Sequence, residues 1–90
     1  MWNPKKNLQW SEVDAEVVVL DQQGGELFRL DPVAGFIWKQ LDGRKDFKEI
    51  AQAICQRFDV QEKTACRDLK QFLADLERWD LLERVTIGGE

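Results

Sequence analysis

Residues 25–43, GELFRLDPVAGFIWKQLDG, predict a strand that runs directly into a helix. Asp31 followed by Pro32 is a typical helix start, because aspartate caps the first turn and proline suits the first helical position. Apolar side chains then recur at helical spacing up to Asp42-Gly43, where glycine suits the left-handed conformation that ends many helices. Nothing in the stretch resembles a catalytic site, so its function has to be inferred from the elements that would pack around it.

Two further strands are predicted upstream of this stretch. Residues 8–13 alternate weakly, and residues 16–21, EVVVLD, form a β-branched run typical of a central strand. Asp14-Ala15 turns the chain between them, and residues 22–25, QQGG, suit a hairpin loop. The three strands form an antiparallel meander, and the third, residues 26–31, has no following strand to pair with.

Two further helices are predicted downstream. Asp46 and Glu49 have the capping-box spacing that opens a helix, and apolar residues follow at helical positions up to Phe58. The last helix is expected from about Glu62 to about Trp79, with an apolar stripe wider than a core-facing helix needs. Either a small domain uses all of the stripe for packing, or one margin is left for a partner. The stripe consists of Ala65, Cys66, Leu69, Phe72, Leu73, Leu76 and Trp79.

This order of elements predicts an α+β fold of winged-helix-like form, a three-stranded antiparallel sheet followed by three helices. We expect a single domain over residues 1–90, with its core at about residues 7–82. Residues 84–87, RVTI, either form a short terminal strand or fray.

Residues suited to catalysis are scarce. The chain has no histidine and no tyrosine, and its one serine, Ser11, has no base near it in the sequence. Because catalysis needs a nucleophile, a base or a metal within reach of one another, we expect no enzymatic activity, no catalytic residues and no cofactor. Cys55 and Cys66 are interpreted as buried apolar residues, with a disulfide or metal pair as the alternative, and the absence of histidine and CxxC excludes the usual zinc sites.

Charge and hydropathy narrow the range of partners. With 13 basic and 17 acidic residues the chain carries a formal charge of −4, which does not suit nucleic acid or an anionic membrane. Residues 62–84, which would enter the major groove in a DNA-binding winged helix, are slightly acidic. No secretion leader and no membrane-length apolar run precedes or interrupts the fold, so a cytoplasmic location is expected.

The unpaired third strand suggests a different partner. An open strand edge is a row of unused N–H and C=O groups, to which an extended peptide can add as a further strand. The last helix would supply apolar anchor sites beside this edge. Two alternatives remain: a winged-helix regulatory protein or adaptor acting through protein or DNA contacts, and a homodimer formed through the same edge. The edge at residues 26–30 and, on the helix, Phe72 and Leu76 are the contacts expected on this basis.

The chain from Val17 to Leu82 resembles the PqqD-like proteins, also called RiPP recognition elements. The most specific marks, in this order and spacing, are Gly25-Glu26-Leu27, Leu30, Ile37-Trp38, Leu41-Asp42-Gly43, Glu49-Ile50, Phe58-Asp59-Val60, Asp68 and Phe72-Leu73. The resemblance implies a non-catalytic module that binds the leader segment of a ribosomally made precursor peptide. It further implies that the leader adds as a strand beside the third helix. The residues that would then bind it are Glu26, Leu27, Phe28, Arg29 and Leu30 on the strand and Leu69, Phe72, Leu73 and Leu76 on the helix. The leader would then be presented to a maturation enzyme, such as a radical-SAM, cyclase or protease protein.

The sequence departs from the family pattern at two places. Asp80 stands where family members often have glycine, and Gln61-Glu62 where they often have Asp-Pro. Aspartate tolerates the left-handed conformation, so we expect Asp80 to end the helix at some cost. Residues 3–10, NPKKNLQW, resemble the broader family more than the protein of pyrroloquinoline quinone biosynthesis that gives the family its name. The enzyme partner and the product therefore stay open.

Overall fold

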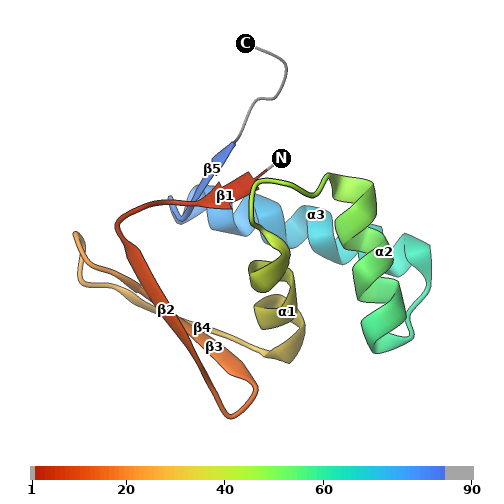
Figure 1. Ribbon diagram of the computed structural model, residues 1–90, viewed down its shortest axis with the longest axis horizontal. Helices are drawn as coiled ribbons and strands as arrows, with labels where there is room; N and C mark the ends of the chain where they lie inside the picture. Colours follow the sequence, from red (N-terminus) through yellow and green to blue (C-terminus); the bar gives the residue numbers. More distant parts are fainter. Residues whose placement is uncertain (1, 85–90) are drawn as a thin grey trace.

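The computed structural model describes residues 2–84, which form five strands and three helices (Figure 1). These elements are β1 (Trp2–Pro4), β2 (Leu8–Val13), β3 (Glu16–Asp21), β4 (Leu27–Leu30), α1 (Pro32–Gln40), α2 (Phe47–Phe58), α3 (Glu62–Arg78) and β5 (Leu82–Arg84).

The predicted meander is present as an antiparallel sheet in the order β2-β3-β4. Asp14 and Ala15 both have positive φ values, 51° and 68°, which suits the tight turn between β2 and β3. In the loop before β4, Gly25 has a φ of 73°, a conformation that costs glycine nothing. The winged-helix-like α+β architecture expected from the sequence is therefore confirmed.

A second, two-stranded sheet was not predicted. β1 pairs antiparallel with β5, so the two ends of the described chain lie side by side (Figure 1). The backbone N–H of Gly43 donates to the Trp2 carbonyl at 2.9 Å, and Lys5 forms an ion pair with Asp80. Of the predicted tail at residues 84–87, Arg84 ends β5 and the other three residues lie outside the described part.

The helix starts follow from local side-chain hydrogen bonds. The Asp31 carboxylate accepts from the Ala34 N–H at 2.8 Å, and Asp46 and Glu49 form a reciprocal capping box at the start of α2. α1 ends at Gln40, slightly before the predicted Asp42-Gly43.

The helix ends use left-handed aspartates where glycine is more usual. Asp59, with a φ of 54°, caps α2, and Asp80, with a φ of 61°, follows α3. The expectation that Asp80 tolerates this conformation is confirmed.

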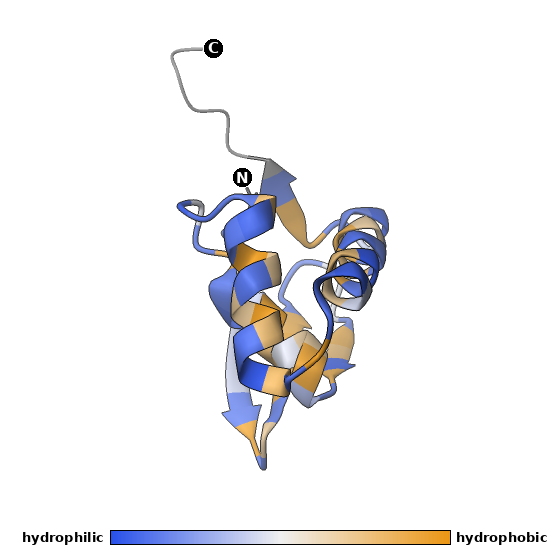
Figure 2. Ribbon diagram, turned by 90° about the vertical axis from the view of Figure 1, so that its right-hand side faces the viewer, coloured by the Kyte–Doolittle hydropathy of each residue, from blue (hydrophilic) through white to orange (hydrophobic). Residues whose placement is uncertain are grey.

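The core lies between the three-stranded sheet and the helices. α1 sits between that sheet and α2, and each helix carries both apolar and polar residues (Figures 1 and 2). Trp38 is the largest fully buried side chain. The buried set consists of Val17, Val19, Leu30, Ile37, Trp38, Leu41, Ile50, Ala51, Ile54, Ala65, Leu69, Leu73, Leu76, Leu81 and Leu82.

The cysteines are half-buried free thiols packed against this core, and they form no disulfide. Within residues 2–84 no group of cysteine and carboxylate side chains is arranged to hold a metal ion. None of the described helices is long and apolar enough to cross a bilayer.

Candidate functional site

β4 is an edge strand whose outer side is unpaired within the described residues. It pairs only with β3, and the Asp21 N–H donates to the Glu26 carbonyl at 2.9 Å. Hydrogen-bonded and non-hydrogen-bonded pairs alternate along an antiparallel ladder, so Phe28 and Leu30 direct their backbone groups toward β3. Leu27 and Arg29 therefore direct their N–H and C=O groups outward, where an added strand would meet them.

The C-terminal end of α3 reaches this edge. The rings of Phe28 on β4 and Trp79 at the end of α3 stack with centroids 5.5 Å apart. Past the end of β4, between the start of α1 and α3, lies a cavity of about 320 Å³. We call the edge of β4, the end of α3 and this cavity together the β4–α3 groove; its cavity is lined by Asp31, Val33, Ala34, Ile37, Asp68 and Phe72.

The surface of the groove combines apolar area with charge. Val33 and Trp79 each keep 38% of their surface exposed, so both can contact a bound partner. On α3, Asp75 forms an ion pair with Arg78 at 2.8 Å, and Asp68 lies 3.6 Å from Arg67. The groove therefore offers apolar contacts along its length and carboxylates at intervals.

The strand residues predicted for the site lie as expected along this edge. Leu27 and Arg29 are exposed, Phe28 is half-buried in the groove, and Leu30 is buried in the core. Glu26 is exposed just before β4, and its carbonyl accepts the Asp21 N–H. Arg29 also reaches Glu16 on the neighbouring strand at 3.7 Å.

The helix residues predicted for an exposed margin of α3 are mostly buried, which corrects that expectation. Leu69 and Leu76 are fully buried, so a substitution at Leu76 would report on stability rather than on an exposed anchor. Leu73 faces another cavity, beside Trp2 and Phe47. Of the four, Phe72 alone lines the groove, because the apolar period of a helix does not say which neighbour each part of a wide stripe meets.

Sequence reasoning left most of the groove residues out of the predicted site; these are Asp31, Val33, Ala34, Ile37, Asp68 and Trp79. Asp68 and Trp79 lie on the same side of α3 as Phe72, at spacings of four and seven residues from it. Val33 joins them because Asp31-Pro32 starts α1 directly after the edge strand. The helical spacing of Asp68, Phe72 and Trp79 was a signal that could have identified this face.

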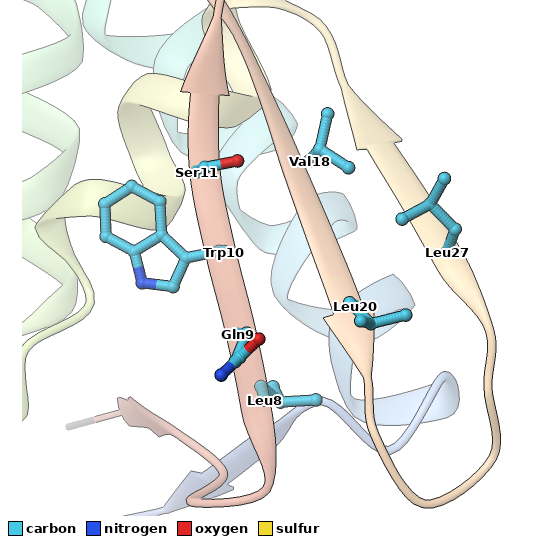
Figure 3. A pocket seen from close by; sticks show the side chains of 7 residues that line it. All are labelled: Leu8, Gln9, Trp10, Ser11, Val18, Leu20 and Leu27. Carbon is cyan, nitrogen blue, oxygen red and sulfur yellow. The ribbon is translucent and has the colours of Figure 1, made fainter.

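Other hollows occur on the described surface, and two of them are larger than the cavity of the groove. One lies over the sheet and is lined by residues from β2, β3 and β4, including Trp10 and Leu27 (Figure 3). Its only hydroxyl is Ser11, and none of its lining residues is charged. The other, of about 470 Å³, separates Trp2 and Phe47 from α3. Neither hollow has the nucleophile, base or metal ligands within reach of one another that catalysis requires.

Comparison with known proteins settles the family. Residues 16–82, well over half of the chain, match the family model described as coenzyme PQQ synthesis protein D (PqqD). The chain belongs to the PqqD family. No curated protein sequence matches this PqqD-family chain.

Solved structures extend the similarity to nearly the whole chain. TbiB1, determined in complex with the TbiA(beta) leader peptide, is 37% identical, with a TM-score of 0.84 over 93% of this chain and 98% of that one. The PqqD truncation of Methylobacterium extorquens PqqCD, described as a functional, stand-alone RiPP recognition element, is 26% identical, with a TM-score of 0.76 over 92% and 88%. A lasso peptide synthetase B1 complexed with its leader peptide is 21% identical and shares the fold, with a TM-score of 0.82 over 91% and 96%.

Proposed function

We propose that this PqqD-family chain is a non-catalytic RiPP recognition element, which captures the leader segment of a ribosomally made precursor peptide by adding it as a strand to β4. The observation that carries the proposal is the open edge of β4 beside an apolar groove. The 37% identity to TbiB1, which was determined with a leader peptide, supports it. The captured precursor is then presented to a modifying enzyme, since the chain supplies no chemistry of its own.

Backbone pairing alone does not hold a peptide in such a groove. Ordering a flexible chain costs about 1–2 kcal/mol per residue, and each strand hydrogen bond returns about 0.5–1.5 kcal/mol. Two or three buried anchor side chains, at about 1.5–3 kcal/mol each, are needed to make binding favourable. Phe28, Phe72 and Trp79 supply the apolar surface on which such anchors would rest.

The opposite edge of the sheet is also unpaired within the described residues. β2 pairs only with β3, which separates it from β4. β2 therefore also serves as an internal control for tests of strand addition at β4.

The test of strand addition is a proline placed at an outward-facing N–H. We expect Arg29→Pro to weaken peptide binding by at least about tenfold, because it removes one hydrogen-bond donor and sets the ring against the incoming strand. Proline is tolerated on an edge strand where the N–H faces solvent, so the melting temperature should stay close to that of the wild type. The ligand would be selected from a displayed library of random 14-residue peptides and titrated by fluorescence anisotropy.

Two matched variants make this test specific. Arg29→Ala removes the side chain and keeps the N–H, so it should bind nearly as well as the wild type. Glu12→Pro places the same ring on β2. The Gln22 N–H donates to the Asn7 carbonyl at 3.2 Å, so residues 7, 9 and 11 bond to β3 and the N–H of Glu12 faces outward. Equal affinity of the wild type and Arg29→Pro would show that peptides do not add to β4.

A further inference from the structure

The cavity at the end of the β4–α3 groove has an apolar surface and an acidic rim. Val33, Ala34 and Phe72 contribute carbon surface, and Ile37 closes the base from within the core. The two charged residues that line the cavity are both acidic: Asp31 directly follows β4, and Asp68 lies on α3. A side chain that enters this cavity therefore meets carbon first and carboxylates at the edges.

Both carboxylates keep acceptor capacity that the fold does not use. One Asp31 oxygen accepts the Ala34 N–H at 2.8 Å, as the helix cap requires. Asp68 has a side chain 55% exposed, and its nearest cation is Arg67 Nε at 3.6 Å, which is a loose contact for an ion pair. Since a carboxylate has about four acceptor positions, each has room for a donor from a bound peptide.

We propose that this cavity selects a lysine or arginine side chain of the leader peptide; the inference rests on the proposed function. The aliphatic part of such a side chain would pack on Val33, Ala34 and Phe72, while its charged end reaches Asp68 and Asp31 at the rim. The negative net charge of the chain, −4, favours the approach of the same cationic segment.

The length of the groove sets where this cation lies in the leader. Asp68 and Trp79 are eleven residues apart on α3, about 16 Å at a rise of about 1.5 Å per residue. An extended peptide covers that distance in about five residues at about 3.3 Å each. Because alternate side chains face the same way, the cation at the Asp68 end and an apolar anchor at the Phe28–Trp79 end lie about four positions apart.

The test is the same random 14-residue library selected separately on the wild type and on charge variants. For the wild type we expect lysine and arginine to be enriched at one position, about four residues from an apolar one. Exposed ion pairs are weak, so the enrichment should be about two- to fivefold for each carboxylate. Asp68→Asn should lower it by about this factor, and Asp68→Lys should replace it with a preference for aspartate and glutamate at the same position.

The controls separate this charge effect from changes in folding or net charge. Asp31→Asn keeps a side chain that caps helices well, so a partial loss of the lysine and arginine preference without a loss of melting temperature is expected. Glu62→Gln, in the first turn of α3, removes one negative charge away from the cavity and should leave the preference unchanged.

The failure of this inference differs from the failure of the proposed function. Equal lysine and arginine frequencies in peptides selected by the wild type and by Asp68→Asn would overturn the assignment of the cavity, while sensitivity to Arg29→Pro would still support strand addition. Peptide selection that is indifferent to Arg29→Pro would overturn the proposed function itself. Enrichment of an uncharged residue at that position in the wild type would likewise overturn the choice of a cation.

Discussion

At the scale of single residues, Gly35 fixes how closely α1 approaches the sheet. A Cβ atom added at Gly35 would lie 2.8 Å from Cγ2 of Val17, and both residues are buried. Real Cβ atoms do not approach side chains this closely, so the absence of a side chain at this position lets the helix pack directly on β3. The start of α1, and with it the cavity of the β4–α3 groove, is placed by this contact.

Gly35→Ala should therefore destabilise the protein although alanine is the better helix former. The helix gains about 1 kcal/mol from the exchange, while overpacking against Val17 costs about 1–3 kcal/mol. We expect a net loss of about 1 kcal/mol in the free energy of unfolding, measured by urea denaturation.

A double-mutant cycle checks the cause of that loss. In a Val17→Ala background Cγ2 is absent and only the 3.3 Å approach to Cβ remains, so the loss caused by Gly35→Ala should become smaller. A loss of the same size in both backgrounds would mean that Val17 is not the residue that excludes the side chain.

At the scale of elements, local capping explains where the first two helices begin. Asp46 and Glu49 satisfy each other's backbone N–H groups at 2.8 and 3.0 Å. α3 has no side-chain hydrogen bond at Gln61, so its start depends more on the packing of its apolar stripe. The helix that forms one wall of the groove is thus held mainly by the core.

Asp46→Ala should lower the stability by about 1 kcal/mol, because it removes the side-chain acceptor of the capping box. For a domain of this size that corresponds to about 4–8 °C in melting temperature. Asp46→Asn keeps an acceptor at the same place and should stay close to the wild type. A loss as large for asparagine as for alanine would argue that the charge, rather than the cap, is what matters.

At the scale of the whole molecule, the charge distribution decides between a peptide and a nucleic acid. The helix that enters the major groove in DNA-binding winged helices carries Glu62, Asp68, Asp75 and Glu77 among its basic residues. Phosphate neutralisation supplies most non-specific affinity for DNA, and an acidic chain offers little of it.

We therefore expect no binding to a 20-base-pair duplex at about physiological salt, measured by fluorescence anisotropy with the protein in the micromolar range. A salt series completes the measurement. Binding that falls steeply as salt rises would indicate phosphate contacts and would favour the regulatory alternative.

The whole molecule also shows why the N-terminal strand escaped sequence reasoning. β1 is three residues long, and its partner β5 lies at the other end of the described chain. Such a short strand has no periodicity of its own, and its pairing arises only once α3 has brought the two ends together.

The sequence by itself determined the elements whose signals are local. The turn at Asp14-Ala15, the caps at Asp31 and Asp46 and the order of three strands and three helices depend on neighbouring residues, so they could be predicted without a fold. The open edge of β4 followed from the same order, because no strand comes after it to pair with it.

Only the tertiary structure decided which part of α3 faces the groove. The pattern of apolar residues marked Leu69, Phe72 and Leu76 alike, but the core takes two of them and leaves Phe72 beside Asp68 and Trp79. Apolar residues at helical spacing indicate only that one face of the helix is buried. Which surface buries each side chain depends on neighbours that are distant in the chain, and these are brought together only when the sheet and the helices pack.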